Sequence, residues 1–376
     1  MSSFFAVLYF SGSAYGFLVA SGLYLKKENR CANRILSTLI VLFSINLLKL
    51  GMDDLGLYRQ FPHIIWMFTS AGFLFGPLIY FYISFLTGDI KKFSPKLLLH
   101  FIPFIVHLLF LLPFWVSSAS DKVLQYERYL SGGFSREYTP LLTYSIKVVH
   151  YLVYVAVSFF RIVRYEKNYK NQCSTTGFHR LVALKTLLIL NMLTLVSIIC
   201  ITILHASKVV SMTHFYSRLS YLWITLILFI LAYTSLRHKM VLELPEKDDL
   251  KSALKKYGDN LLPEKEASAY LQKLLEFMEK EKPYLDSNLN IAVLAHKTGI
   301  PRHVISQVIN RKLKKNFFYF VNHYRLEYVK KLLCSNKNKK RNILSLALEA
   351  GFNSKSHFNT FFKKETGMTP SEFRKL

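Results

Sequence analysis

Near its carboxyl end the chain reads Ile343-Leu344-Ser345-Leu346-Ala347-Leu348-Glu349-Ala350-Gly351-Phe352-Asn353-Ser354-Lys355-Ser356-His357-Phe358. Apolar residues recur at helical spacing before Gly351, and a segment with a polar outer face follows Ser354. Glycine permits the positive φ angle that a sharp turn requires, and serine is a favoured residue at the start of a helix. The stretch therefore predicts a short helix, a tight turn and a second helix.

An earlier stretch, residues 289–310, repeats this layout. Leu294, Ala295 and Gly299 each lie 52 residues before Leu346, Ala347 and Gly351, and Ile305, Ile309 and Phe320 each lie 53 residues before Phe358, Phe362 and Phe373. The second copy therefore has one extra residue in its turn. The layout is that of a helix-turn-helix, whose second helix reads DNA in the major groove. Between the copies, apolar residues of 317–333 predict one long helix that bridges both units.

Residues 351–358 and 362–374 closely resemble the carboxyl-terminal signature of the AraC-type (AraC/XylS) bacterial transcription regulators. Residues 305–310 and 322–325 resemble the membrane-attached branch of that family, which carries seven or eight spans. The resemblance covers about a quarter of the chain, and it implies an AraC-type DNA-binding domain with two helix-turn-helix units. One departure is visible, because the first unit has Lys314 where the second has Gly367.

The composition divides the chain into parts of different character. The net charge is +26, and apolar residues make up 52% of the chain, which is more than a soluble protein of this size needs. Residues 287–376 hold 18 Lys/Arg and 4 Asp/Glu, whereas residues 237–286 hold 10 and 11. A strongly basic terminal region indicates a phosphate-bearing partner, either DNA or anionic lipid. The four cysteines are scattered and predict neither a disulfide framework nor a zinc site.

Seven apolar stretches precede residue 237. They cover residues 4–25, 32–51, 62–86, 97–116, 141–163, 181–204 and 219–236. Each is near the ~20 residues that a helix needs to cross a bilayer, and only helices satisfy their own backbone groups in lipid. The first stretch lacks the basic start of a signal peptide, so we expect it to be retained. The predicted architecture is all-α, with a seven-helix transmembrane domain at 1–236, a connector at 237–286 and a DNA-binding domain at 287–376.

Basic residues in the predicted loops indicate the orientation of these spans. The first, third and fifth loops carry 12 Lys/Arg, whereas the second, fourth and sixth carry 6. Positive loops face the cytoplasm, so the amino terminus is predicted to lie outside and the carboxyl-terminal domain inside. The expected location is therefore the inner (cytoplasmic) membrane, with several passes and the DNA-binding domain in the cytoplasm.

Polar residues at depth within the spans form a candidate sensor cluster, and the spans contain no Asp or Glu. The cluster comprises Asn46, His107, Lys147, His150 and Asn191. A polar pocket for an external signal is one interpretation of these residues. The alternative is ordinary hydrogen bonding between helices, with Lys147 extending toward the interface. The lack of carboxylates within the spans argues against an ion-coupled transporter.

The connector contains a predicted amphipathic helix. Pro263 suits a first helical position, and Ala267, Leu271, Leu274 and Met278 follow at helical spacing. Two roles are open for this stripe. It could form a short dimerisation or signalling helix, or it could pack on the DNA-binding domain, because fewer than two heptads are too few to indicate a coiled coil.

The outward side of each second helix holds the candidates for base contacts. They are Arg302, His303, Ser306 and Gln307 in the first unit and Lys355, Ser356, His357, Asn359 and Thr360 in the second. Arg, Gln and Asn can each form two hydrogen bonds to a base edge, so Arg302, Gln307 and Asn359 are the strongest candidates. Candidate phosphate contacts are Arg311, Lys312, Lys314, Lys315, Lys363 and Lys364. For each lysine the alternative is a solvated surface position.

These features favour a membrane-anchored, one-component, sequence-specific transcription regulator that couples a signal at the membrane to gene expression. Its expected partners are double-stranded promoter DNA and the lipid bilayer. RNA polymerase, a second copy of the chain in a homodimer and an unknown small-molecule signal are further candidates. The sequence predicts no enzyme, cofactor or metal site, because neither a nucleophile–base pairing nor a metal-ligand spacing stands out.

Two alternatives stay open. The membrane half could be a transporter or receptor whose DNA-binding tail regulates its own synthesis, or the chain could be a tether that holds chromosomal DNA at the membrane. The sequence predicts neither the ligand nor the target genes. It also leaves open activation or repression, the oligomeric state and proteolytic release of the DNA-binding domain.

Overall fold

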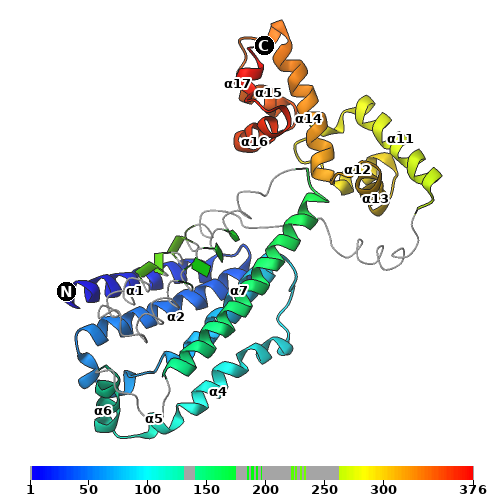
Figure 1. Ribbon diagram of the computed structural model, residues 1–376. Helices are drawn as coiled ribbons and strands as arrows, with labels where there is room; N and C mark the ends of the chain where they lie inside the picture. The colour runs from blue at the N-terminus through cyan, green and yellow to red at the C-terminus, as the bar shows by residue number, and fades with distance from the viewer. Residues whose placement is uncertain are drawn as a thin grey trace. The chain divides into compact units, whose positions relative to one another are not determined.

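The computed structural model describes residues 2–130, 140–174 and 262–375, together with isolated residues between 184 and 233. The regular elements in these ranges are helices, drawn in Figure 1. The chain divides into two compact units. The first comprises residues 1–163 and 180–242, and the second comprises residues 164–179 and 243–376.

The first two helices of the first unit, α1 (Ser2–Leu25) and α2 (Arg30–Asp54), pack closely against each other. A Cβ atom at Gly16 would lie 2.0 Å from the Ser44 Oγ atom, so glycine lets the two backbones approach. The Ser37 hydroxyl on α2 donates to the Ala20 carbonyl on α1 at 2.7 Å. Small residues and hydroxyl bonds of this kind join helices that have no hydrophobic driving force between them in lipid.

The α2 helix extends past its predicted end at residue 51. Its last turn contains Asp53 and Asp54, so carboxylates lie at the end of this helix although the predicted span has none. The Lys49 ammonium group lies 2.5 Å from the Asp53 carboxylate, and the Tyr126 hydroxyl donates to the same carboxylate at 3.1 Å. Lys49 is therefore neutralised by a neighbour one turn away.

The predicted third span is only partly α-helical. Short 3-10 turns, η1 (Leu57–Arg59), η2 (Pro62–Ile64) and η3 (Thr69–Ala71), precede α3 (Gly72–Leu86). The helix α7 (Pro140–Lys170) continues past the predicted end of the fifth span at residue 163. The Arg161 guanidinium on α7 donates to Ser84 Oγ at 2.8 Å and to the Tyr80 hydroxyl at 2.6 Å, which joins α7 to α3.

The predicted fourth span is interrupted. It consists of η4 (Pro95–Phe101), α4 (Ile102–Phe110) and α5 (Leu112–Val116). Pro103 and Pro113 lie in the first turns of α4 and α5. Proline has no N–H to donate and clashes with the preceding turn, so each one favours the start of a new helical segment.

A small apolar cluster joins the second and fourth predicted loops. The helix α6 (Ala119–Leu130) supplies Tyr126, which packs with Tyr58, Trp66 and Phe114. Lys122 is buried beside this cluster, and its ammonium group donates to the carbonyls of Trp115 and Ser117 at 2.9 and 3.0 Å. The two loops thus pack together as one ordered substructure.

Four segments of the described residues are long and apolar enough to cross a membrane. They are Phe4–Leu25, Arg30–Asp54, Pro62–Leu86 and Ser145–Lys170, and Pro95–Phe110 is a shorter apolar helix. Most residues of the predicted spans at 181–204 and 219–236 lie outside the described residues. The prediction of several long apolar helices is therefore confirmed, whereas a bundle of seven stays a prediction.

The second unit contains the two helix-turn-helix copies that the sequence predicts. Its elements are α11 (Glu264–Glu281), η5 (Pro283–Leu285), α12 (Ile291–Thr298), α13 (Arg302–Lys312), α14 (Phe317–Cys334), η6 (Asn336–Asn338), α15 (Ile343–Glu349), α16 (Lys355–Thr366) and α17 (Pro370–Phe373). Side-chain oxygens cap the starts of several of these helices. The Asn290 oxygen accepts from two backbone N–H groups of α12, and Ser354 caps α16 as expected.

Each copy has its own hydrophobic core, and α14 belongs to both. Phe317, Phe320 and Val321 of α14 join the core of α12 and α13. Later residues of the same helix, including Val329 and Leu333, join the core of α15 and α16. Figure 1 shows α14 running between the two groups of helices. The predicted bridging helix is thus confirmed, and it fixes the separation of the two copies.

The amphipathic helix α11 packs within this unit. Ala267, Leu274 and Met278 are buried in the core that α12 and α13 share. The Lys312 ammonium group at the end of α13 contacts the Glu264 carboxylate and donates to Ser268 Oγ at 3.0 Å. Because the apolar stripe is covered by the same chain, the structure favours packing over dimerisation for this helix.

Positive φ angles occur at equivalent places in the two copies. Gly299 and Gly351 have φ angles of 67° and 91° in the turns between the paired helices. After the second helix of each copy, Lys314 has a φ of 53° and Gly367 a φ of 78°. Lys314 therefore adopts the conformation that glycine provides in the second copy, and the sequence departure leaves the turn geometry intact.

Gly351 also lies against η5, which precedes the first copy, and against Arg325 of α14. A Cβ atom at this position would lie 2.3 Å from the Tyr284 carbonyl oxygen and 2.9 Å from Arg325 Nε. A backbone oxygen cannot move aside as a flexible side chain can. Glycine is therefore required here both for its φ angle and for the close approach of this turn to η5.

We expect Gly351→Ala to lower the free energy of unfolding of the second unit by roughly 2–5 kcal/mol, from the strained φ angle and the clash with Tyr284 combined. The matched control is Gly367→Ala, which also has a positive φ but no atom within 4 Å of the added Cβ. It should cost only about 1–2 kcal/mol. Thermal unfolding of the full chain, detected by limited proteolysis, measures both changes. Equal losses of unfolding free energy in the two variants would contradict the close approach at Gly351.

Candidate nucleic-acid interface

The second helix of the second copy, α16, is held by aromatic side chains on one face. Phe358, Phe361 and Phe362 are buried, and the Tyr319 hydroxyl on α14 donates to the Glu365 carboxylate. The opposite face is open to solvent and carries six exposed polar or charged side chains. These are Lys355, Ser356, Asn359, Thr360, Lys363 and Lys364. The helix thus presents a rigid polar surface of the kind that enters a major groove.

His357 differs from the other predicted base contacts on α16. It is partly buried, and its ring centroid lies 5.1 Å from that of Phe318 and 5.6 Å from that of Phe352. A histidine among aromatic rings contributes to the packing of the helix on α14. Its position therefore favours a supporting role over direct contact with a base.

The second helix of the first copy, α13, buries Val304, Ile305, Val308 and Ile309. The predicted base contacts on this helix, Arg302, His303, Ser306 and Gln307, are all partly exposed. Asn310 donates to the Ser306 hydroxyl at 3.3 Å. Apart from His357, the apolar and polar faces that the sequence predicts for the two second helices are the faces that the structure buries and exposes.

The candidate phosphate contacts fall into two groups. Lys314, Lys315, Lys363 and Lys364 are exposed. Arg311 and Lys312 lie against α11, where Arg311 donates to the Leu262 carbonyl at 3.3 Å and Lys312 contacts Glu264. The Lys312 ammonium group holds the pKa of the exposed Glu264 carboxyl below its usual value. Arg311 and Lys312 are thus engaged by α11 and by Leu262 ahead of it, and the Lys315 ammonium group lies 3.9 Å from the centroid of the Tyr319 ring.

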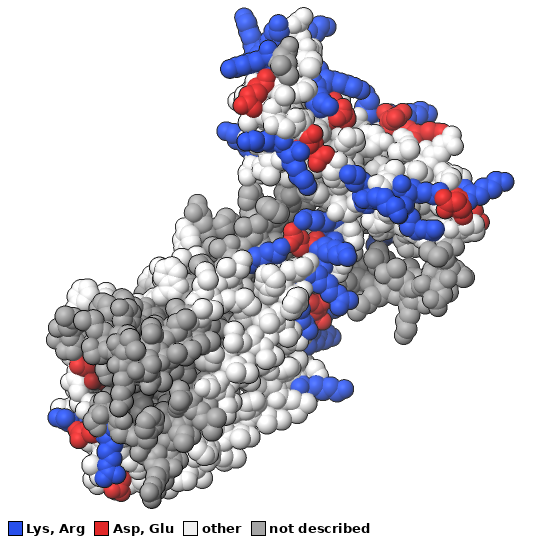
Figure 2. Space-filling model, in the orientation of Figure 1, with Lys and Arg blue, Asp and Glu red and all other residues white. Residues whose placement is uncertain are grey.

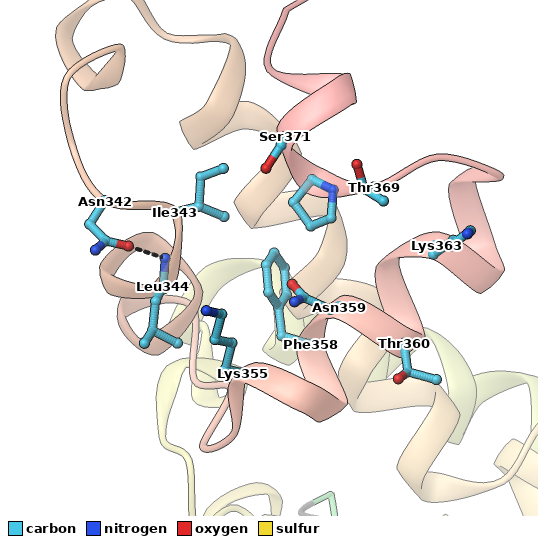
Figure 3. A pocket seen from close by; sticks show the side chains of 11 residues that line it. Asn342, Ile343, Leu344, Lys355, Phe358, Asn359, Thr360, Lys363, Thr369 and Ser371 are labelled. Carbon is cyan, nitrogen blue, oxygen red and sulfur yellow. Dashed lines mark hydrogen bonds between the residues drawn. The ribbon is translucent and has the colours of Figure 1, made fainter.

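A surface groove runs beside α16. It is lined by Lys355, Asn359, Thr360 and Lys363 of α16 and by residues that begin α15 and α17. Figure 3 shows Asn342 and Ser371 across the groove from α16. Neither residue lies on a second helix, where the sequence predicts the base contacts. The capping positions of Asn342 and of Thr369, which forms a capping box with Glu372, are the sequence signals that mark the neighbouring helix starts.

The charge of the second unit matches this surface. Residues 287–376 carry a net charge of +14. In Figure 2 Lys and Arg side chains gather over this unit, whereas the described helices of the first unit are mostly white along their sides. A cationic surface binds the phosphate backbone without regard to sequence, and base contacts from the recognition helices then provide specificity.

Three residues of the predicted sensor cluster lie together in the first unit. The ring centroids of His107 and His150 lie 5.2 and 5.3 Å from that of Phe73, and Lys147 Nζ lies 5.9 Å from it. His107 Nδ1 shares a hydrogen bond of 2.8 Å with Ser70 Oγ. Asn46 lies on α2 and is partly exposed, whereas Asn191 lies outside the described residues. Within those residues no group of His, Cys, Asp and Glu side chains could hold a metal ion.

Comparison with known proteins identifies the carboxyl-terminal part of the second unit. A family profile described as "Helix-turn-helix domain" matches residues 294–376. An uncharacterized HTH-type transcriptional regulator of Pseudoalteromonas carrageenovora is 29% identical over 96 residues, which are 24% of this chain and 55% of the relative. The melibiose operon regulatory protein of Escherichia coli strain K12 is 28% identical over 110 residues, which are 29% of this chain and 34% of that relative.

The chain thus spans about half or less of the length of the curated relatives that it matches. A solved protein of unknown function from Listeria innocua is 25% identical, with a TM-score of 0.25, over 28% of this chain and 94% of its own. Residues 294–376 form an AraC-type helix-turn-helix domain, a class of DNA-binding transcription regulators that are not enzymes. Several long apolar helices precede it.

Asn359 and Lys363 allow base contact and phosphate contact to be separated on one helix. We expect Asn359→Ala to cost about 1–3 kcal/mol of binding free energy on a preferred site and to relax the sequence preference. Lys363→Ala should weaken binding to all duplexes similarly and reduce the slope of log K against log salt by about 1. Titrations of the full chain at several salt concentrations distinguish the two effects. Identical behaviour of the two variants would contradict the assignment.

Proposed function

We propose that the chain is a membrane-anchored transcription regulator. It binds specific double-stranded promoter DNA through α13 and α16, and seven spans hold it in the inner membrane with its amino terminus outside. The observation that carries this proposal is the presence, in one chain, of a tandem helix-turn-helix domain and of long apolar helices. Few functions other than gene regulation at a membrane need both.

One internal contact supports the proposed topology. Residues 172–174 follow the predicted fifth span and belong to the same compact unit as the DNA-binding domain. The basic residues of the fifth loop by themselves predict that this loop lies on the cytoplasmic side. A contact between this loop and the DNA-binding domain requires both on one side of the membrane, as the proposed topology has them.

The proposed signal acts at the outer loops or at the polar cluster in the first unit. His107 Nε2 and both ring nitrogens of His150 are buried without a hydrogen-bond partner among the described residues. Polar groups in that state are uncommon and often serve a ligand or proton. The ordered cluster around Tyr58, Trp66 and Tyr126 forms the proposed outer face.

The alternative of a transporter- or receptor-like membrane half rests on a specific observation. The helix over residues 95–116 is interrupted, and broken helices are characteristic of many transporter binding sites. Substrate uptake by reconstituted vesicles containing the full chain would favour that alternative.

Reporter fusions at both ends test the membrane proposal. A carboxyl-terminal fusion should be active with a reporter that works only in the cytoplasm, and an amino-terminal fusion with one that works only outside it. Fractionation should place the intact chain in the inner membrane, resistant to carbonate extraction. A carboxyl-terminal domain exported from the cytoplasm, or a chain released by carbonate, would contradict the proposal.

The sensor proposal predicts a separate loss of signalling. In the parent chain, some growth conditions should change the activity of a reporter at a promoter that the chain binds. In His107→Leu or His150→Leu this reporter activity should stay constant across those conditions, while the affinity for DNA is unchanged. Leu109→Phe is the control, because Leu109 is exposed on the same helix as His107. The measurement is promoter-reporter activity together with DNA titration. A retained response in both histidine variants would remove the cluster from the mechanism.

A further inference from the structure

Three residues from the stretch between the predicted fifth and sixth spans are built into the DNA-binding unit. The Ile291 N–H donates to the Gln172 carbonyl at 2.9 Å, and the Ser174 N–H donates to the Leu289 carbonyl at 3.4 Å. Cys173 faces Asn290 between these bonds in an antiparallel bridge. Residues 172–174, here named the docking segment, thus pair through an isolated antiparallel bridge with the backbone that leads into α12.

Side chains reinforce this backbone pairing. The Ser174 hydroxyl donates to the Leu289 carbonyl and accepts from Arg325 Nη2 at 3.1 Å. The Ser174 carbonyl accepts from Arg325 Nη1 at 3.2 Å and from Asn322 Nδ2 at 2.9 Å. All three residues of the docking segment are buried, and Ser174 is fully inaccessible. A segment held by this many buried polar bonds is part of the fold of the unit, not a chance surface contact.

Arg325 connects the docking segment to both helix-turn-helix copies. Its guanidinium also donates to the carbonyls of Tyr284 and Asp286 at 2.7 and 2.8 Å, ahead of the first copy. Gly351, in the turn of the second copy, lies close to Arg325 Nε. Arg325 is 1% exposed, and burial lowers the pKa of its guanidinium to about 10. A buried charge is costly unless every N–H finds an acceptor, so loss of the Ser174 acceptors disturbs the junction of the two copies.

The position of the docking segment indicates that it supports DNA binding and does not block it. Its partners are residues 289–291, 322 and 325, and none of these lies on α13 or α16. The segment therefore leaves the DNA-facing helices uncovered. It acts on the arrangement of the two copies, which must match the spacing of two major-groove segments.

We propose that the docking segment is the element through which the membrane half controls DNA binding. When docked, it completes the partners of Arg325 and holds the two copies in the arrangement that binds DNA. When withdrawn, it leaves Arg325 short of acceptors and loosens that arrangement. Gln172 lies two residues after the end of α7, so a change in this helix reaches the domain by a route separate from the connector. The effect on DNA rests on the proposed function.

A disulfide bond tests the docking directly. In the full chain with Cys31, Cys200 and Cys334 replaced by Ser, Asn290→Cys places a thiol opposite Cys173. Paired residues between ladder bonds of antiparallel strands have Cα atoms about 4.5 Å apart, within the range that disulfides span. Oxidation of membranes should crosslink most of this variant within the chain. Asn288→Cys, at an exposed position outside the bridge, should crosslink far less.

Two further variants sharpen this result. Cys173→Ser should abolish the crosslink of Asn290→Cys. Ser174→Ala should lower its yield, because the variant loses the hydroxyl that joins Leu289 to Arg325. Equal crosslinking at positions 288 and 290, or no crosslink at either, would overturn the docking.

The effect on DNA is measured with the same Asn290→Cys chain, in detergent, before and after oxidation. The probe is a labelled duplex from a genomic region that the parent chain binds. Oxidation should hold the segment in place and keep binding at least as tight as in the reduced chain. Ser174→Ala should weaken binding about tenfold, which corresponds to about 1.4 kcal/mol. Unchanged DNA affinity in Ser174→Ala would overturn the proposal that the docking segment controls DNA binding. A parent chain that binds no DNA would instead contradict the proposed function. In that case the crosslink still tests whether the segment docks.

Discussion

The sharing of α14 by two hydrophobic cores is the constraint on which the DNA-binding unit depends. Phe317 and Val321 bury themselves with α12 and α13, whereas Val329 and Leu333 do so with α15 and α16. A continuous helix cannot shorten or kink sharply without breaking its own hydrogen bonds, so the distance between α13 and α16 is set by its length. DNA-binding geometry thus follows from packing within one helix and two small cores.

The junction at Arg325 adds a polar constraint to this apolar one. The guanidinium donates to carbonyl oxygens of the segment before α12 and of Ser174. Gly351 allows the turn of the second copy to approach the guanidinium. Buried polar groups specify an arrangement more sharply than apolar contacts, because each one is costly when its partner is missing. The same property makes the junction sensitive to whatever moves its partners.

The sequence predicted the second unit well because its signals are local. Glycine turns at Gly299 and Gly351, the cap at Ser354 and the apolar periodicity of α14 each act within a few residues. Contacts between residues far apart in the chain were not predicted. Nothing local marks Ser174 as a partner of Arg325, or His357 as a ring packed on Phe318. The apolar composition of residues 97–116 predicts one span, whereas Pro103 and Pro113, which can kink a helix, lie where the structure begins α4 and α5.

The central claim is that one chain binds specific DNA from within a membrane. Genome-wide mapping of the crosslinked full chain, recovered from washed inner membranes, tests it most directly. The account predicts a small number of discrete promoter regions that carry two recognition segments about one helical turn apart, enriched in the membrane fraction. Uniform recovery of chromosomal DNA, or no DNA with the membrane-bound chain, would contradict it.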